Sequence, residues 1–271
     1  MRKANTMNTV KKLPIKSNFH THTTRCRHAS GTDKEYVEAA INAGIKILGF
    51  SDHTPYPTGT NFKSGMRISL DETDGYFSSI SSLKKEYASD IKIYIGLEAE
   101  YFPEYFHKLT EYLKDYPLDY MILGEHFVPD EEHGFYVGGQ FTDYAPLELY
   151  TKYVLEAMET GCFSYVAHPD LPYYIGNNSA KLLTETYEKI CVKAKELNIP
   201  LEINCLGNSR SSSIYPCDSF LDIAARTGND MIIGLDAHSP EQFYNYDNTL
   251  NCVNKAKSRK LHLIDTLPFC E

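Results

Sequence analysis

Short apolar runs alternate with longer amphipathic stretches along most of the chain. The apolar runs predict seven buried strands, at 18–22, 45–53, 91–98, 120–126, 164–168, 200–204 and 231–238. Between them, apolar residues recur at helical spacing, which predicts helices at 32–43, 69–88, 146–160, 179–198, 219–227 and 247–257, and one that begins near Pro103. This alternation is typical of a parallel sheet in an α/β fold. We expect a closed or nearly closed α/β barrel, with an open doubly wound sheet as the second choice.

Capping residues mark the ends of two of these helices. Thr32 or Asp33 suits the start of the first helix, and Gly44 stops it. Ser69 and Glu72 have the spacing of a capping box, in which each residue satisfies a backbone N–H of the other. These signals support helix boundaries that periodicity alone leaves open.

Length, charge and cysteine content narrow the class of protein. A chain of 271 residues suits one large domain, and we expect a flexible basic extension at 1–16 before a single domain at 17–271. The net charge of −9 argues against nucleic-acid binding. No apolar run approaches the roughly 18 residues that a membrane span needs. The seven scattered cysteines, an odd number without a CxxC pair, predict reduced thiols and a cytoplasmic location.

Histidines and carboxylates gather where the predicted strands end. The sets are His20-Thr21-His22, Ser51-Asp52-His53, Glu98, His126, His168-Pro169-Asp170 and Asp236-Ala237-His238. Residues two apart on a strand face the same side, so His20 and His22 can bind one ion together. Active sites of parallel α/β barrels form at the C-terminal ends of the strands. We therefore expect these side chains to meet on one rim, where His28 can join them from the following loop.

This set of side chains indicates metal chemistry. Nitrogen and carboxylate ligands without a thiolate cluster suit zinc, manganese or iron. A catalytic zinc usually takes only three protein ligands, so the set exceeds the need of one ion. Two or more neighbouring ions are a common means of clamping both oxygens of an in-line phosphoryl displacement. The sequence therefore predicts a multinuclear site suited to phosphate esters.

The ordered motifs resemble those of the PHP (polymerase and histidinol phosphatase) family of metal-dependent phosphoesterases, and more closely those of its histidinol-phosphatase branch. The resemblance spans about residues 18–240 and rests on His20-Thr-His22, His28, Ser-Asp-His53, Gly-Leu-Glu98, His126, His168-Pro-Asp and Leu-Asp236-Ala-His238. It implies a distorted (β/α)7 TIM-like barrel with three divalent ions, of zinc, manganese or iron, at the C-terminal strand ends.

The resemblance also implies a ligand set of nine residues. The first ion is then held by His20, His22, Glu98 and Asp236; Glu98 bridges to a second ion completed by His126 and His168; and His28, His53 and His238 hold the third.

Members of this branch also use arginines to hold the phosphate. Arg210, after the sixth predicted strand, matches one such position with a small shift. A second arginine that some members carry shortly after the strand-5 histidine is missing here, where Asp170 stands. Arg67 is the candidate substitute. For both arginines the alternative is an ordinary solvated side chain.

The activity that the resemblance implies is hydrolysis of L-histidinol phosphate to L-histidinol and phosphate, a step of histidine biosynthesis. Asp236 and His238 are candidates to pass a proton to the leaving alkoxide, unless coordination occupies them fully, and Arg210 to neutralise charge on the phosphate. The expected partner is a small phosphate ester, without nucleic acid or membrane, and a homo-oligomer is compatible with the sequence.

Three other interpretations remain open at this stage. Another PHP phosphoesterase, acting on a nucleotide or sugar phosphate, would keep the same metal ligands. An amidohydrolase-type barrel also begins with HxH, but it carries a bridging lysine on strand 4, and residues 118–127 contain none. A non-catalytic PHP module is the third possibility, although degenerate copies lose ligands and all nine motif positions are filled here.

Overall fold

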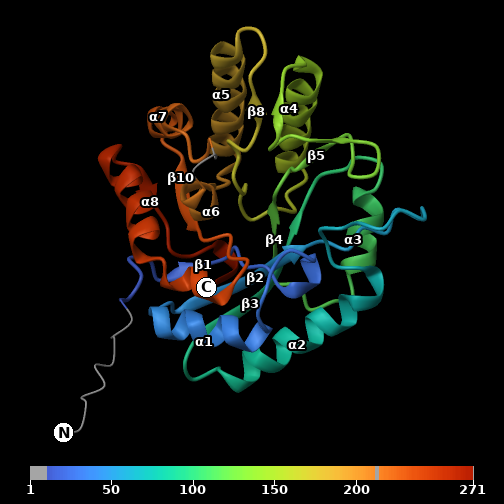
Figure 1. The fold of residues 1–271 in the computed structure, drawn as a ribbon, viewed down its shortest axis with the longest axis vertical. Helices are drawn as coiled ribbons and strands as arrows, with labels where there is room; N and C mark the ends of the chain where they lie inside the picture. The colour runs from blue at the N-terminus through green and yellow to red at the C-terminus, as the bar shows by residue number, and fades with distance from the viewer. Residues whose placement is uncertain (1–10, 211–213, 271) are drawn as a thin grey trace, which may run out of the picture.

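The computed structural model describes residues 11–210 and 214–270. Parallel strands form the centre of the molecule, and helices surround them (Figure 1). The principal strands are β1 (Ser17–Asn18), β2 (Ile47–His53), β3 (Lys92–Ala99), β4 (Tyr120–Leu123), β9 (Leu201–Asn204), β10 (Asp230–Gly234) and β11 (His262–Leu263). The helices are α1 (Asp33–Ala43), α2 (Thr73–Glu86), α3 (Phe106–Leu113), α4 (Tyr144–Glu159), α5 (Ser179–Leu197), α6 (Cys205–Ser209), α7 (Asp218–Thr227) and α8 (Tyr246–Ser258). None of the helices in the described ranges is long and apolar enough to cross a membrane.

The strands close into a ring. One sheet has the order β1-β2-β3-β4 and a second has the order β11-β10-β9, with parallel pairing throughout. Val166 forms bridges to Leu123 and Leu201 and so joins β4 to β9, while a bridge between Thr21 and Ala237 joins the other two edges. The predicted barrel is confirmed, and the alternative of an open doubly wound sheet is wrong. The fifth predicted strand, 164–168, is reduced to these single bridges.

Most predicted helices form with the caps that the sequence indicates. Thr32 and Glu35 make a capping box at the start of α1, and Gly44 ends the helix with φ 86°. Ser69 and Glu72 form the second capping box, around the 3-10 turn Leu70–Glu72 that precedes α2. The helix expected near Pro103 begins three residues later, at Phe106. The sequence did not predict α6 or the short pairs β5 (Phe127–Val128) with β6 (Phe135–Tyr136) and β7 (Gln140–Phe141) with β8 (Tyr173–Tyr174).

Of the extension expected at residues 1–16, the structure describes residues 11–16. Residues 1–10 lie outside the described residues, but 11–16 contact the barrel domain. Leu13 and Ile15 are buried, and the backbone N–H of Leu13 donates to the carbonyl of Ala43. Two apolar side chains before residue 17 therefore belong to the core of the domain.

The two-residue period of the strands separates the outside of the barrel from its interior. On β3, Ile93, Ile95 and Leu97 pack under the helices, whereas Tyr94 belongs to a separate buried cluster inside the ring. That cluster consists of Phe19, Tyr94, Tyr120, Ile122, Tyr165, Ala167, Ile232 and Leu267. Phe269 packs against it, with ring centroids 5.0 Å from Tyr120 and 5.1 Å from Tyr94. Aromatic side chains thus fill the interior, and the polar site occupies only its C-terminal end.

Candidate metal centre

All nine predicted ligands lie at or just beyond the C-terminal ends of the barrel strands. His20 and His22 follow β1, His53 ends β2, Glu98 lies near the end of β3, His126 follows β4, His168 follows the bridging segment at Val166, and Asp236 and His238 follow β10. His28 comes from the loop after the 3-10 turn Thr24–Cys26. The structure brings this whole set together, as the strand-end pattern predicted.

Glu98 lies at the centre of the group, and its two oxygens face different histidines. Oε1 lies 2.9 Å from Nε2 of His168 and 3.6 Å from Nε2 of His126. Oε2 lies 3.1 Å from Nδ1 of His53, and it also faces Nε2 of His20 at 3.4 Å and Nε2 of His22 at 3.5 Å. The carboxylate is buried, with 1% of its surface exposed. This placement suits a carboxylate shared between two ions.

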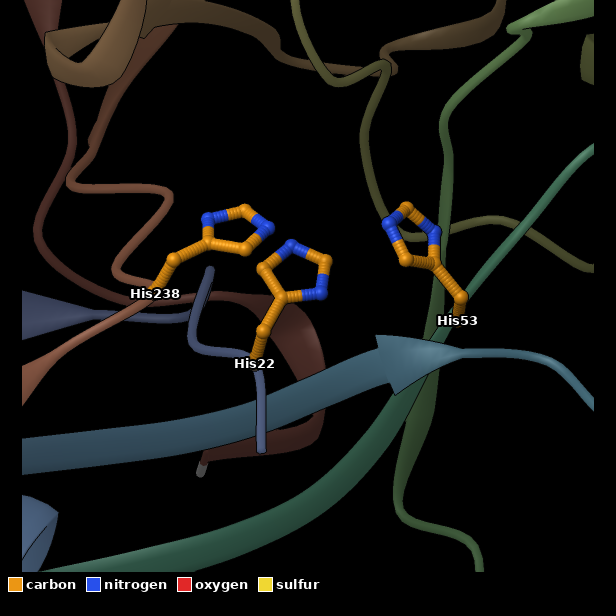
Figure 2. Close-up of side chains that lie close together, drawn as sticks. All are labelled: His22, His53 and His238. Atoms are coloured by element: carbon orange, nitrogen blue, oxygen red, sulfur yellow. The ribbon is translucent and has the colours of Figure 1, made fainter. Parts of the chain in front are cut away.

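A second group of ligand atoms surrounds Asp236 and His238. Oδ1 of Asp236 lies 3.1 Å from Nε2 of His22. The ring of His22 lies between those of His238 and His53, with centroid distances of 4.1 Å and 4.4 Å (Figure 2). Nε2 of His238 and Nε2 of His28 are 3.0 Å apart. Two ring nitrogens turned toward each other in this way can direct both lone pairs at one cation.

Several of these atoms have no hydrogen-bond partner within the described part of the chain. They are Nε2 of His20, both ring nitrogens of His22, Nδ1 of His53, Oε2 of Glu98 and Nδ1 of His168. Buried polar atoms are almost always satisfied, so a group of unsatisfied ones needs an explanation. Overlapping triads of ligand atoms, such as His22 with His53 and His238, or His20 with His168 and Asp236, lie within 4.8 Å of one another. The residues present therefore fit divalent cations.

The charge balance of the site also favours cations. Burial raises the pKa of Glu98, but the surrounding histidines, led by His20, outweigh it and hold the pKa well below its usual range. Burial lowers the pKa of His22, whereas the nearby carboxylates of Asp236 and Asp52 outweigh it and raise the pKa to about 9. Burial and the neighbouring His22 lower the pKa of His238 to about 3. The carboxylates are thus ionised, and without added positive charge they draw protons onto the nearest rings.

A second layer of carboxylates and carbonyls holds the far side of several rings. Nδ1 of His20 donates to Glu202 at 2.8 Å, and Nδ1 of His126 donates to Glu100 at 3.1 Å. Nδ1 of His28 and of His238 donate to backbone carbonyls, at 2.6 Å and 3.0 Å. Partners of this kind fix the tautomer, so that Nε2 is left as the ligand atom.

Sequence reasoning missed both carboxylates of this layer. Glu100 lies two residues after Glu98, just past the end of β3, and Glu202 lies on β9 two residues before Asn204, whose side chain donates to Asp236 at 3.1 Å. Residues two apart on an extended chain face the same side, so each carboxylate is turned toward the cluster. That spacing was visible in the sequence. The identity of the histidine that each carboxylate holds was not visible, because it depends on strand pairing.

Two ligand candidates adopt an unusual backbone conformation. His168 has φ 29° and Asp236 has φ 52°, although neither is glycine. Left-handed backbone of this kind costs of the order of 1–3 kcal/mol and tends to occur at functional sites. Its presence at two positions of the cluster indicates that the fold holds these side chains against a local preference.

A cavity of about 80 Å³ opens onto the cluster. Its walls beyond the ligands are Met66, Tyr136, Leu171, Leu206, Arg210 and Tyr215. Arg210 is exposed and lies just after α6, so the predicted arginine reaches the site cavity. The tyrosines and apolar side chains of this wall were not singled out in the sequence.

Arg67 does not occupy the position that the sequence suggested. Its guanidinium donates to both oxygens of Glu100, at 2.9 Å and 3.1 Å, and to Glu131 at 2.5 Å. The residue is buried, and it lines a neighbouring cavity of about 600 Å³ instead of the one at the cluster. Because two carboxylates already take up its donors, Arg67 is not placed to bind phosphate.

The PHP domain family model matches residues 18–206, which include seven of the nine candidate ligands, Glu98 among them. The chain therefore belongs to the PHP domain family. With the barrel and the strand-end cluster, this membership excludes the amidohydrolase interpretation.

Curated relatives point to one branch of the family, and a solved structure has the same fold. The chain is 29% identical over 234 residues to a probable histidinol-phosphatase of Deinococcus radiodurans, which covers 82% of this chain and 85% of that protein. It is 27% identical over 255 residues to the histidinol-phosphatase of Bacillus subtilis, covering 82% and 93%. The crystal structure of histidinol phosphate phosphatase from Lactococcus lactis, complexed with zinc, L-histidinol and phosphate, superposes with a TM-score of 0.73 at 19% identity, covering 92% and 95%.

Proposed function

We propose that the protein is a metal-dependent phosphate monoester hydrolase that converts L-histidinol phosphate and water to L-histidinol and phosphate. The observation that carries this proposal is the buried cluster around Glu98, where ligand atoms without hydrogen-bond partners converge at the end of a PHP barrel. The named activity of the Deinococcus and Bacillus relatives supports the choice of substrate.

The proposed centre holds three divalent ions. His20, His22, Glu98 and Asp236 form the first set, Glu98 with His126 and His168 the second, and His28, His53 and His238 the third. The two-sided placement of Glu98 supports a bridging role. Zinc in the Lactococcus structure supports zinc as one of the metals, and the nitrogen and oxygen donors also suit manganese or iron.

Divalent ions bound by these residues would supply Lewis acidity, which would acidify water and neutralise charge on the phosphate oxygens. The protein side chains then orient and hold the substrate. Arg210, on the wall of the cavity, donates planar hydrogen bonds to the phosphate. Asp236 and His238 lie at the same cavity and are the candidates to pass a proton to the leaving alkoxide.

The metal ligands do not distinguish one leaving group from another. Among the described residues, Arg210 is the arginine on the wall of this cavity, and Arg67 is held by Glu100 and Glu131. A nucleotide or sugar phosphate would meet the same metal ligands. Its leaving group would contact Tyr136, Tyr215 and the apolar wall in a different way. The experiment must therefore compare substrates directly.

The test is phosphate release from a panel that contains L-histidinol phosphate, nucleoside monophosphates and sugar phosphates, at equal concentrations and with added Zn²⁺ or Mn²⁺. We expect kcat/KM to be highest for L-histidinol phosphate. A nucleotide or sugar phosphate hydrolysed faster would overturn the substrate and keep the phosphoesterase class. Release from none of the compounds would overturn the activity and favour a non-catalytic module.

The proposed location is the cytoplasm. All seven cysteines fall within the described residues, and none of them forms a disulfide. Free thiols are typical of reducing compartments.

A further inference from the structure

Arg67 joins three segments of the chain that are distant in sequence. It donates to the carbonyl of Thr54 after β2, to Glu100 after β3 and to Glu131 in the loop between β5 and β6. Its side chain is 5% exposed, and that of Glu100 is fully buried. A buried arginine with this many carboxylate bonds has a fixed position, and it fixes its partners as well.

Glu100 carries this fixed geometry to the metal cluster. Oε1 of Glu100 receives one bond from the guanidinium, at 3.1 Å, and one from Nδ1 of His126, also at 3.1 Å. The opposite nitrogen of the ring, Nε2, faces Oε1 of Glu98. With its proton held on Nδ1, His126 presents Nε2 as an unprotonated ligand atom.

Glu202, a second carboxylate that receives a hydrogen bond from a ligand ring, is arranged differently. Glu202, which binds Nδ1 of His20, takes its further bonds from the backbone N–H of His168 at 2.9 Å and from Nδ2 of Asn204 at 2.9 Å. Within the described part of the chain, no arginine or lysine pairs with Glu202. The series of hydrogen bonds that begins at Arg67 therefore reaches only the side of the cluster where His126 lies.

We propose that Arg67 is a positioning residue for the metal centre: through Glu100 it sets the orientation and tautomer of His126 and so the binding of the ion shared by His126, His168 and Glu98. This inference rests on the proposed metal-dependent function. It replaces the role in phosphate binding that the sequence suggested for the same arginine.

The alternative is a purely structural role, in which Arg67 ties the loop of Glu131 to the barrel. Ser64 also donates to Glu131, at 2.6 Å, so this loop has a second anchor. Glu131→Gln separates the two roles, because it weakens the bond between Arg67 and the loop and leaves the pair of Arg67 with Glu100 intact. Arg67→Lys keeps the positive charge. The lysine ammonium lacks the planar set of donors with which the guanidinium bonds to both oxygens of Glu100 and to a third acceptor.

The experiment measures metal content and Zn²⁺ affinity of the full chain, by elemental analysis and by competition with a chelator. The variants are Arg67→Met, Arg67→Lys and Glu131→Gln. Arg259→Met is the matched control, because Arg259 forms a similar double ion pair with Asp218 and Asp222 at a distance from the cluster in the fold.

In Arg67→Met we expect one class of Zn²⁺ sites to weaken by roughly 10–100-fold, the range measured for partners that orient metal ligands, while the remaining sites keep their affinity. Arg67→Lys should show a smaller loss, and Glu131→Gln and Arg259→Met should bind as the wild type does. If Arg67→Met does not fold, Arg67→Lys compared with Glu131→Gln carries the same contrast.

Unchanged Zn²⁺ affinity in both Arg67 variants would overturn the positioning role. Equal losses in Arg67→Lys and Glu131→Gln would also overturn it, since they would point to the loop contact. A wild-type protein that binds no divalent ion would overturn the proposed metal centre itself, so the two failures are distinguishable.

Discussion

Oε1 of Glu98 lies 2.9 Å from Nε2 of His168, although 70 residues separate them in the chain. Strand β3 delivers the carboxylate, and the bridging segment at Val166 delivers the ring. A side chain at Gly124 would collide with this carboxylate, so the glycine leaves the space that Glu98 occupies. The pair shows how closely the barrel rim is built around one central acid.

Glu98→Gln should be among the most damaging changes to the site. A bridging position needs two negative oxygens, and the amide offers one neutral oxygen and an NH₂ group. Loss of a partner that only orients a ligand costs 10–100-fold, so we expect kcat/KM to fall by roughly 10²-fold or more, with reduced metal content. Steady-state kinetics and elemental analysis test this expectation, with the exposed Glu104→Gln as the control. Wild-type turnover and metal content in Glu98→Gln would exclude the bridge.

Arg210→Ala should affect the substrate and leave the metals in place. Removal of a charged hydrogen bond costs about 1.5–3 kcal/mol of binding free energy. The negative charge of the phosphate in the transition state also loses its positively charged partner. We expect kcat/KM to fall by roughly 10²-fold, with partial recovery in Arg210→Lys. Arg226→Ala, which removes an exposed arginine paired with Glu188, is the control. Normal kinetics in Arg210→Ala would place the phosphate anchor elsewhere on the cavity wall.

Gly96→Ala should destabilise the barrel. A methyl group at Gly96 would enter the space of the Tyr120 ring, which fills the interior and donates to the carbonyl of Phe19 at 2.7 Å. Overpacking of a core typically costs 1–3 kcal/mol, so we expect a loss of about that size in the free energy of unfolding, measured with urea on metal-free protein. Gly75→Ala in α2 is the matched control: its methyl group meets open space, and it should change stability by no more than about 1 kcal/mol, in the stabilising direction. Equal effects of the two changes would contradict the packing account of the interior.

The sequence predicted the barrel well because its evidence is local. Periodicity marked the strands, and caps such as Thr32 and Gly44 marked helix ends that the structure confirms. The convergence of the histidines followed from strand direction alone, since the C-terminal ends of parallel strands meet on one rim.

What the sequence could not supply depends on contacts between distant segments. Arg67 looked like a phosphate ligand because a loop arginine near the rim is compatible with that role. Only the register of β3 with its neighbours places Glu100 within reach of Arg67 and His126 together. The pairs β5–β6 and β7–β8 were missed for a similar reason, because two-residue strands carry almost no periodic signal.

The number of ions in the active enzyme tests the central claim most directly. Elemental analysis of the purified chain, alongside phosphate release from L-histidinol phosphate before and after chelation, gives that number and its connection to activity. The account predicts more than one divalent ion per chain, loss of activity with chelator, and recovery with Zn²⁺ or Mn²⁺. A fully active preparation with a single ion per chain, or activity that survives complete removal of metal, would contradict the multinuclear centre around Glu98.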